Sequence, residues 1–403
     1  MNLKIYAKTI DETAKEQINT LMEQEVFRDC KVRIMPDVHA GAGCVIGFTA
    51  DLGNKVIPNI VGVDIGCGML TVELGNIDLD LHKLDEVIKK YVPSGFNVHE
   101  NKEGVSDFDF EQLRCYKNLK GLSHLKSSMG TLGGGNHFIE IDVDDEGNKY
   151  LVIHTGSRNL GKQVADYYQE LANQILNYNI EEYKEKRNKL IAEYKEQGKH
   201  QEIASALEVF NKESSISKNI VPKELSYLEG NHRDDYLHDM RICQRFAIEN
   251  RKQIASEILS KMEFGYAWDN VTKFETIHNY IDLETNIVRK GAISAKKDEI
   301  LLIPINMRDG CIVGKGKGND DWNQSAPHGA GRLMGRMEAK RQLNMQDFTE
   351  SMKGIFTTTA VEDTIDEAPM AYKPIEDILD SIGDTVEVLR IIKPIYNYKA
   401  TGD

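Results

Sequence analysis

The segment Val63-Asp64-Ile65-Gly66-Cys67-Gly68 is the part of this sequence that most restricts its fold and its chemistry. It places a carboxylate and a thiol three residues apart among glycines. Aspartate and cysteine thiolate are both anionic metal ligands, and a thiolate can bridge two ions. An Asp-x-x-Cys pair alone is more often a turn carboxylate beside a buried thiol. A metal site is therefore a hypothesis that needs support from the rest of the chain.

Three later motifs supply imidazoles, namely Asn136-His137, His154-Thr155-Gly156-Ser157 and His278-Asn279. A single histidine after an apolar run is usually a hydrogen-bonded core residue. Three of them, together with Asp64 and Cys67, favour a site for one or two transition ions. Carboxylate, thiolate and imidazole suit Mn, Fe, Co or Zn better than Mg or Ca.

A further motif, Pro327-His328-Gly329-Ala330-Gly331-Arg332, surrounds a histidine with small residues and so leaves room for a bulky group. A glycine loop that opens a helix offers backbone N–H donors to phosphate, and arginine can bind phosphate through two hydrogen bonds. From these residues alone, His328 could be a metal ligand, a base or a nucleophile toward phosphorus.

Two weaker motifs precede these. Met35-Pro36-Asp37-Val38-His39 puts an acid and an imidazole on one side of a turn that follows a strand. The turn is either structural or, beside a metal site, a source of a base or of a residue that orients a ligand imidazole. The glycine run Gly133-Gly134-Gly135 permits close approach of a ligand, but it matches neither a dinucleotide fingerprint nor a Walker loop.

Composition restricts the class of protein. The 403 residues can bury a large core, and length alone suggests two or three domains. The net charge of −14 argues against a general nucleic-acid coat. Residues 289–341 nevertheless carry eleven Lys/Arg against six Asp/Glu. This local excess of positive charge fits either a solvated surface or the handling of phosphates.

Cysteine usage and hydropathy predict a cytoplasmic protein without a membrane partner. The six cysteines are widely spaced and none forms a Cys-x-x-Cys pair, which argues against a disulfide framework and a zinc ribbon. The N-terminal residues show no apolar run of signal-peptide length, and no stretch approaches the length of a membrane span.

The chain divides into three regions by pattern. Residues 1–160 are typical of strands and tight loops, residues 161–265 are helical and highly charged, and residues 266–403 return to strands and glycine loops. The charged helical face has a simple explanation as a solvated insertion. We expect strands at 31–35, 59–63, 150–153 and 385–392. We expect two long helices around a polar loop near 213–232, and helices at about 234–262, 330–342 and 375–382.

Seven motifs occur in the order Met-Pro-Asp-Val-His, Val-Asp-Ile-Gly-Cys-Gly, Gly-Asn-His-Phe, His-x-Gly-Ser-Arg, His-Asn, Arg-Lys-Gly-Ala and His-Gly-Ala-Gly-Arg. In this order they resemble the RtcB family of RNA-splicing ligases, from about residue 20 to the C-terminus. The resemblance implies an α+β fold and a single catalytic domain over residues 1–403, with a mixed β core, flanking helices and residues 161–265 as a helical insertion.

The resemblance also implies an activity. RtcB enzymes join an RNA 3′-phosphate or 2′,3′-cyclic phosphate to a 5′-hydroxyl, using GTP and Mn²⁺. A histidine attacks the α-phosphorus of GTP and becomes guanylylated, GMP passes to the RNA 3′-phosphate to give RNA-ppG, and the 5′-hydroxyl then displaces GMP. The implied cofactors are GTP and a pair of Mn²⁺ ions per chain, and the implied partners are RNA ends and, as for some family members, the activator archease.

Site residues follow from the same resemblance. His328 corresponds to the guanylylated histidine. The implied metal ligands are Asp64, Cys67, His137, His154 and His278, with Cys67 as the bridge. The implied nucleotide-binding positions are Asn136, Glu140, Asn306, Cys311, His328, Gly329, Ala330, Gly331, Tyr372 and Lys399, of which Asn136 contacts phosphates and Glu140, Tyr372 and Lys399 contact guanine. Candidates for contacts with RNA or phosphate are Asp37, His39, Arg158, Arg289, Lys290 and Arg332.

The chain departs from the family pattern around the nucleotide. Ile305-Asn306-Met307-Arg308 replaces a Gly-Ser-Met-Gly loop, Cys311 stands where serine is common, Ala326-Pro327 replaces small polar residues before His328, and the C-terminus reads Lys399-Ala400-Thr401-Gly402-Asp403. These changes concern base recognition and substrate choice rather than metal chemistry, and GTP remains the expected nucleotide.

Two other functions stay open. One is a dinuclear metallophosphoesterase that acts on RNA or nucleotide phosphates. The other is an inactive protein that binds RNA ends, which is disfavoured because no metal or nucleophile position has been lost.

Overall fold

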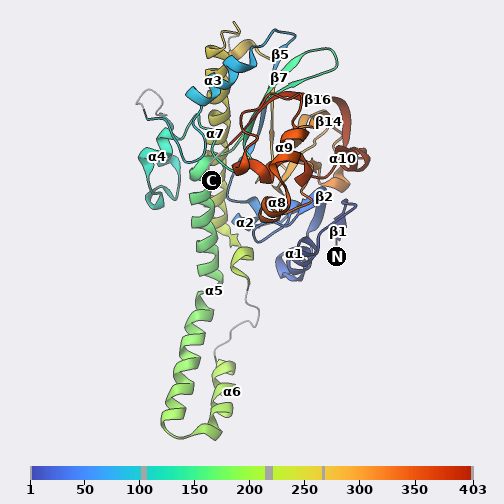
Figure 1. Ribbon diagram of the computed structural model, residues 1–403. Coiled ribbons are helices and arrows are strands. Elements are labelled where there is room, and N and C mark those ends of the chain that lie inside the picture. Colours follow the sequence, from blue (N-terminus) through green and yellow to red (C-terminus); the bar gives the residue numbers. More distant parts are fainter. Residues whose placement is uncertain (1, 101–106, 214–220, 266–267, 401–403) are drawn as a thin grey trace.

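The computed structural model describes residues 2–100, 107–213, 221–265 and 268–400. Its fold is α+β, as predicted, with mixed strands and helices in one body and a long helical arm that projects from it (Figure 1). No helix in these ranges is both long and apolar enough to cross a lipid bilayer.

A seven-stranded sheet forms the larger β layer, and all of its neighbouring strands are antiparallel. Its strands, in spatial order, are β13 (Ile300–Asn306), β14 (Gly310–Gly316), β16 (Val386–Lys399), β6 (Phe138–Val143), β7 (Lys149–Thr155), β5 (Gly68–Gly75) and β9 (Lys273–Ile277).

A five-stranded sheet forms the second layer and is mixed, because β1 and β2 are parallel and the other pairs are antiparallel. Its order is β1 (Asn2–Ile5), β2 (Lys31–His39), β3 (Ile46–Asp51), β11 (Ile287–Lys290) and β10 (Asn279–Ile281). Two small ladders pair β12 (Ala292–Ser294) with β15 (Ser325–Pro327) and β4 (Lys55–Val56) with β8 (Leu228–Glu229).

The register of the large sheet brings distant segments to one edge. Gly68, the first residue of β5, pairs with Thr155 at the end of β7 and with Ile277 at the end of β9. Phe138, the first residue of β6, pairs with His154. Since antiparallel neighbours place the start of one strand beside the end of the next, the residues that flank these positions converge.

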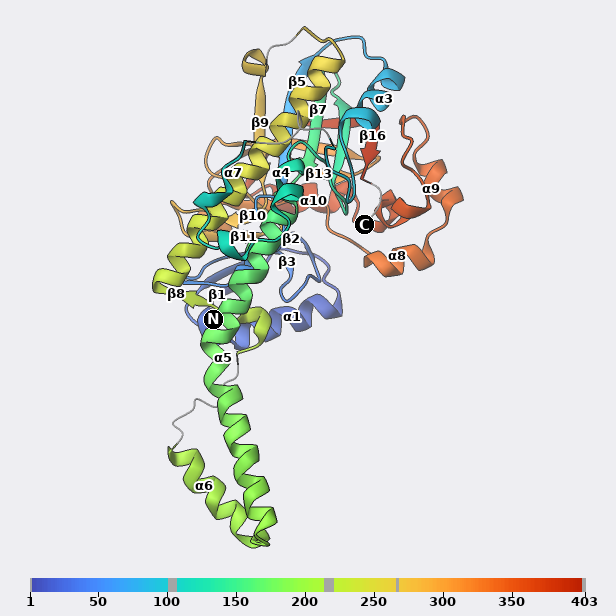
Figure 2. The same cartoon turned by 90° about the vertical axis from the view of Figure 1, so that its left-hand side faces the viewer.

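The helices are α1 (Glu12–Glu23), α2 (Pro58–Val61), α3 (Leu81–Tyr91), α4 (Leu122–Ser127), α5 (Arg158–Glu196), α6 (Ile203–Glu213), α7 (Gly230–Lys261), α8 (Arg336–Gln342), α9 (Met345–Ser351) and α10 (Ile375–Ile382). Helix α7 lies along the large sheet (Figure 2). Its Ile254 and Ile258 are fully buried in one apolar cluster with Leu70 and Leu151 of the sheet. Burial of such side chains contributes about 1.5–3 kcal/mol each.

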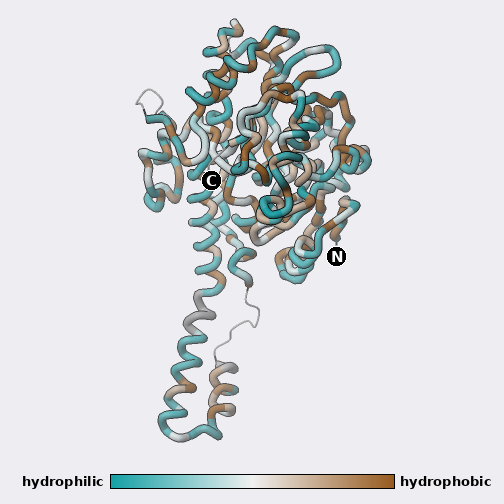
Figure 3. Tube along the Cα trace, viewed as in Figure 1, coloured by the Kyte–Doolittle hydropathy of each residue, from teal (hydrophilic) through white to brown (hydrophobic). Residues whose placement is uncertain are grey.

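The distal part of α5 and helix α6 form the arm. None of the described side chains between residues 183 and 210 is buried, and Tyr183 stacks on Phe210 with ring centroids 5.1 Å apart. The arm is largely hydrophilic (Figure 3). A solvated helical insertion therefore fits the arm but not α7, which buries many of its side chains against the body.

Three expected elements are wrong in kind or extent. Residues 59–63 begin in helix α2, because Pro58 occupies its first turn, where a missing N–H costs nothing. Strand β2 continues through Pro36 to His39, because its pairing with β3 is interrupted between Ile34 and His39 and no ladder N–H is needed there. The helix expected at 330–342 begins only at Arg336.

Other expectations are confirmed. Residues 150–153 lie in β7, residues 375–382 form α10, and the strand expected at 385–392 is β16, which extends to Lys399. Two long helices, α5 and α7, flank the polar loop near 213–232, although α7 already begins at Gly230. Residues 214–220 of that loop, and 401–403 of the C-terminal motif, lie outside the described residues.

Candidate metal and nucleotide site

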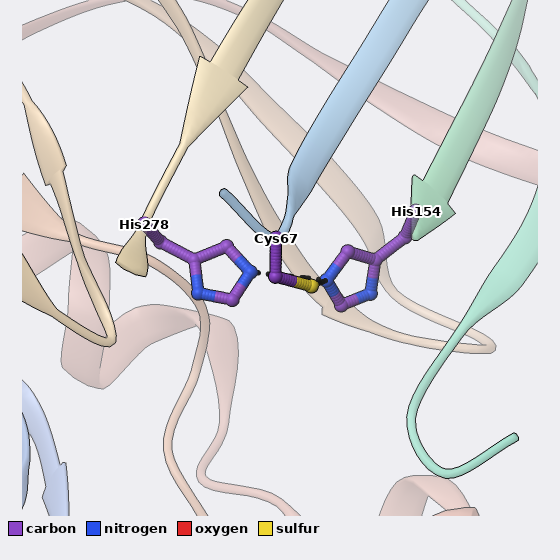
Figure 4. A group of neighbouring side chains, drawn as sticks. All are labelled: Cys67, His154 and His278. Atoms are coloured by element: carbon purple, nitrogen blue, oxygen red, sulfur yellow. Dashed lines mark hydrogen bonds between the residues drawn. The ribbon is translucent and has the colours of Figure 1, made fainter. Parts of the chain in front are cut away.

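Five of the sequence-derived ligand candidates meet at the shared edge of the large sheet, and we call them the metal-ligand cluster: Asp64, Cys67, His137, His154 and His278. The Cys67 Sγ lies 3.3 Å from His154 Nε2 and 3.5 Å from His137 Nε2. Figure 4 shows His154 and His278 pointing toward each other beside Cys67, with their Nε2 atoms 3.1 Å apart. Asp64 Oδ2 lies 3.0 Å from His137 Nε2.

Cys67 belongs to two groups of mutually close donor atoms. One group joins it to His154 and His278, and the other joins it to Asp64 and His137. Each group keeps its donor atoms within 4.8 Å of one another. A thiolate in the shared position could serve as a ligand for a cation in either group.

The histidine ring nitrogens are oriented as metal ligands usually are. His137 Nδ1 lies 2.8 Å from the Leu132 carbonyl oxygen, and His154 Nδ1 lies 3.2 Å from that of Asn136. A carbonyl accepts only, so each Nδ1 carries the proton and each Nε2 keeps a lone pair. Second partners of this kind fix the tautomer of ligating histidines. His278 Nδ1 has no hydrogen-bond partner among the described residues, so without a cation His278 can carry its proton on Nε2 and donate it to His154 Nε2.

Burial disfavours the charged forms of Cys67, His154 and His278 in the metal-ligand cluster. It raises the pKa of the Cys67 thiol well above its usual value, and the Asp64 charge raises it further. It also lowers the pKa values of His154 and His278 well below 6.5, so both rings are neutral. For Asp64, burial favours the neutral form, but the contact with His137 and the positive charge of Arg158 outweigh it, and its pKa is lowered. Neutral imidazoles, a carboxylate and a thiol that a cation would deprotonate fit a transition-metal site.

Helix α7 supports this edge through two buried side chains that the sequence did not single out. Arg251 donates to the carbonyl oxygens of Gly66 and Thr155, at 2.9 and 2.8 Å. Asn250 accepts from the backbone N–H groups of Gly130 and Thr131 and donates to the Gly156 carbonyl oxygen. Arg251 therefore holds the turn between Asp64 and Cys67, and Asn250 holds the backbone at Gly130–Thr131 and at Gly156, next to His154. In sequence they are ordinary polar residues of a charged helix and carry no motif.

His328 lies beside the metal-ligand cluster, with its ring centroid 4.8 Å from that of His278. Its Nδ1 lies 2.6 Å from Asp37 Oδ2, and the same oxygen accepts from its backbone N–H at 3.1 Å. The second oxygen of Asp37 is buried with no hydrogen-bond partner among the described residues. Asp37 therefore holds the proton of His328 on Nδ1 and leaves Nε2 as a nucleophilic lone pair.

A cavity of about 170 Å³ opens next to His328. Of the positions that the resemblance assigns to the nucleotide, all but Cys311 line it: Asn136, Glu140, Asn306, His328, Gly329, Ala330, Gly331, Tyr372 and Lys399. His39 and Arg332 line it too. Burial lowers the pKa of His39 to about 4, and its Nδ1 lies 2.9 Å from the Asp37 carbonyl oxygen.

One wall of the cavity is built around Glu367, and we call it the Glu367 cluster: Arg332, Arg336, Glu367, Tyr372 and Lys399. Glu367 lies 2.7 Å from Lys399 Nζ and 2.8 Å from Arg336, and it accepts from the Tyr372 hydroxyl at 2.6 Å. Burial would raise the pKa of Glu367, but the charges of Lys399, Arg336 and Arg332 lower it to about 2. The sequence missed Glu367 and Arg336, because the acidic stretch 362–367 is typical of a solvated surface.

Five of the candidates for nucleotide, RNA or phosphate contacts do not line the cavity: Asp37, which is buried against His328, and Cys311, Arg158, Arg289 and Lys290. Cys311 is fully buried behind Glu140, with its Sγ 3.8 Å from Glu140 Oε1. Arg158 donates to Thr131 Oγ1 and to the Gly95 carbonyl oxygen.

Arg289 and Lys290 have internal partners instead of a free face. Arg289 is fully buried and donates to Ser325 Oγ, to Tyr280 and to backbone carbonyls, and it pairs with Asp282. Lys290 Nζ donates to the carbonyl oxygens of Ala42 and Asn59, both at 2.9 Å. These internal partners argue against the prediction that the two cations hold RNA phosphates, because part of the positive charge of residues 289–341 is used inside the fold.

Comparison with known proteins agrees with this geometry. The family model described as tRNA-splicing ligase RtcB matches residues 17–118 and 116–400. The chain belongs to the RtcB family. It is 29% identical over 426 residues to RNA-splicing ligase RtcB1 of Escherichia coli, an alignment that covers 96% of this chain and 94% of the relative.

Two further relatives are similar over most of their length. RNA-splicing ligase RtcB of Escherichia coli strain K12 is 28% identical over 427 residues, with 96% of this chain and 94% of the relative covered. tRNA-splicing ligase RtcB of Nanoarchaeum equitans is 25% identical over 437 residues, with 86% and 83% covered. The RtcB match therefore includes the strand ends of the metal-ligand cluster as well as the loop of His328.

Proposed function

We propose that this RtcB-family protein is a GTP- and Mn²⁺-dependent RNA ligase, which joins an RNA 3′-phosphate or 2′,3′-cyclic phosphate to a 5′-hydroxyl through guanylylated His328. One observation carries the proposal. A histidine whose Nδ1 is held by a buried carboxylate, 2.6 Å away, lines the same cavity as the nucleotide positions and adjoins the metal-ligand cluster.

The metal-ligand cluster would hold a pair of Mn²⁺ ions, with Cys67 shared between the two groups of ligands. Bound there, the ions would neutralise triphosphate charge and increase the electrophilicity of the phosphorus under attack. The chain contributes the donor tautomers of His137 and His154, which their backbone partners fix. It also contributes Arg251, which holds the turn that carries Cys67.

In the first step, the Nε2 lone pair of His328 attacks the α-phosphorus of GTP. The N–P bond forms as the bond from the α-phosphorus to the bridging oxygen breaks, and pyrophosphate leaves. The ring then carries positive charge with its proton on Nδ1, where the Asp37 carboxylate accepts the hydrogen bond. Asp37 thus positions His328 and stabilises the charge that develops on it.

Two transfers complete the reaction. An oxygen of the RNA 3′-phosphate attacks the guanylyl phosphorus, the N–P bond breaks, and RNA-ppG forms. The 5′-hydroxyl of the second RNA end then attacks the 3′-phosphorus and displaces GMP. A 2′,3′-cyclic end must first be opened by water to the 3′-phosphate. Archease is a proposed partner that some family members use.

The cavity residues fit the recognition of GTP. Glu140 offers carboxylate oxygens to the N–H groups of guanine, and Tyr372 and Lys399 form the neighbouring wall. Lys399 donates to the Asn136 carbonyl oxygen at 3.1 Å, so it links the base wall to the loop before His137. The Gly329–Gly331 loop lines the cavity beside His328 and would face the phosphate groups, while the Arg332 guanidinium is bonded to Glu367 and to the Tyr372 hydroxyl.

The test is mass spectrometry of the full chain after incubation with GTP and Mn²⁺. We expect a GMP adduct on the peptide that contains His328, and no adduct in His328→Ala. His124→Ala, which removes an exposed histidine, serves as the matched control and should be labelled like the wild type. Absence of an adduct on wild-type protein that hydrolyses RNA phosphates would favour the metallophosphoesterase instead. Loss of both metals in His328→Ala would contradict its assignment as a nucleophile.

A further inference from the structure

A second group of buried ionisable side chains lies behind the cavity. Glu140 and Asp142 alternate along β6 and therefore face the same side of the sheet. Their carboxylate oxygens and the Cys311 Sγ of β14 lie within 4.8 Å of one another. Glu140 is 2% exposed, and Asp142 and Cys311 are fully buried. Two carboxylates this close cannot both stay ionised without compensation.

No hydrogen bond is donated to Asp142 by the described residues. Neither of its oxygens has a partner among the described residues. Burial raises the pKa of Glu140 as well, but Glu140 accepts from the Asn397 side-chain amide and feels the positive charge of Lys399, whereas the Cys311 thiol lies near both carboxyls. The ionised form is thus stabilised at Glu140 and not at Asp142. A proton on Asp142 supplies the missing donor and removes the repulsion.

We propose that Asp142 is a neutral carboxylic acid that donates a hydrogen bond to Glu140 and thereby fixes the orientation in which Glu140 accepts from the base of GTP. The inference rests on the proposed function, in which Glu140 contacts guanine. Asp142 is a positioning residue, since it does not line the cavity. It acts together with Asn397, whose amide holds the other side of the Glu140 carboxylate.

The electrostatics agree with this assignment. Burial raises the pKa of Asp142 well above 3.8, and the neighbouring Glu140 charge raises it further. The other titratable groups that face the pair are Cys311, whose pKa is also raised by burial, and Lys399, which is paired with Glu367. Tyr150 lies across from Asp142 on β7, but its hydroxyl is bonded to Asp144 and Arg390.

Unfolding without nucleotide tests the proton directly. Above pH 3.8 the unfolded chain ionises at Asp142 while the folded chain keeps the proton, so folding takes up a proton and stability falls as pH rises. Asp142→Asn keeps an N–H donor toward Glu140 and cannot ionise. We expect this variant to be more stable than wild type at neutral pH in urea, with a gap that widens as pH increases. A less stable Asp142→Asn would overturn the proposal, because it would mean that the carboxylate itself is needed.

Metal analysis of the same proteins decides independently between a shared proton and a bound cation at Glu140 and Asp142. The Glu140, Asp142 and Cys311 donors could instead share a cation. Elemental analysis of wild type loaded with Mn²⁺ or Zn²⁺, compared with Asp142→Asn, would then show an ion that the variant lacks, and that result would overturn the shared proton. Equal metal content in both proteins is the expected result.

Nucleotide binding tests the role of the pair. We expect Asp142→Asn to keep the preference for GTP over ATP, whereas Asp142→Leu, which has no donor, should lose about tenfold or more of it. At alkaline pH, wild type should lose GTP affinity relative to Asp142→Asn. Tyr150→Phe, which removes a hydroxyl bonded to Asp144 and Arg390, is the control on β7 and should keep the wild-type pH profile. The proposal is contradicted if Asp142→Asn loses the preference as Asp142→Leu does. Wild type that forms no GMP adduct would instead remove the proposed function and leave the unfolding result standing.

Discussion

The metal-ligand cluster and the Glu367 cluster line the same region of the molecule, but their charges are balanced in opposite ways. Around Glu367, three cations and a hydroxyl from the chain itself surround one buried carboxylate. Around Cys67, the imidazoles are neutral and the thiol carries a raised pKa because burial disfavours its charge. The first cluster balances its charge with side chains of the chain itself, whereas the second combines donor types that suit a cation. Removing a residue should therefore affect stability in one and metal content in the other.

The largest effect is expected for Cys67→Ser. A hydroxyl is a far poorer donor than a thiolate at neutral pH, and Cys67 is shared by both groups of ligands. The affinity for both ions should fall by about a hundredfold or more, because loss of a residue that only supports a metal ligand already costs about 10–100-fold in affinity. Ligation should become undetectable. Elemental analysis measures the stoichiometry. His137→Ala and His154→Ala are the controls and should each affect mainly one ion. A Cys67→Ser protein that keeps two tightly bound ions would refute the bridge.

The next effect concerns Glu367→Gln, which should destabilise the fold while leaving metal content unchanged. The pKa of Glu367 is lowered from 4.5 to about 2. Its charge therefore contributes roughly 3 kcal/mol at neutral pH, since one pKa unit corresponds to about 1.4 kcal/mol. This contribution is present above pH 4.5 and is lost as pH falls toward 2. Denaturant unfolding across this range should show an acid-dependent loss in wild type that the variant lacks. An unchanged pH profile would mean that the surrounding cations do not hold Glu367 ionised.

Arg289→Met tests a buried cation away from the cavity. Arg289 pairs with Asp282 and fills its hydrogen-bonding capacity inside the fold. Breaking such a pair from one side costs about 3 kcal/mol or more. We expect lower stability but an unchanged affinity of the folded protein for RNA ends, measured at several salt concentrations. A reduced salt dependence would return Arg289 to the RNA-binding surface.

The smallest effect is expected on the arm. Lys189 is exposed on α5, in a region where no described side chain is buried. Lys189→Ala should change stability by less than about 0.5 kcal/mol and leave guanylylation and RNA binding as in wild type. Loss of RNA binding with intact guanylylation would place the RNA path along the arm. That result would leave the ligase proposal unchanged. It would mean that the main contact with RNA lies on the arm and not at either cluster.

The chemistry of the site could be predicted from the sequence where it depends only on residue types and on the order of the motifs. The five residues of the metal-ligand cluster and His328 were all named from motifs, and the structure places them together. Strand 150–153 and helix 375–382 were also predictable, because their apolar periodicity is local. Helix α2 was not, since an apolar β-branched run of this length does not distinguish a buried strand from a buried helix turn.

The tertiary structure alone decided which charges face the cavity and which are used inside the fold. Arg289 and Arg332 are both arginines of one basic segment, yet the first is fully buried beside Asp282 and the second lines the cavity. Glu367, Asn250 and Arg251 carry no motif, and their roles come from partners far away in sequence. The sequence by itself determined the donor types that a metal and a nucleotide require. Burial and antiparallel register determined their charge states and their meeting point, because both depend on contacts that no local pattern records.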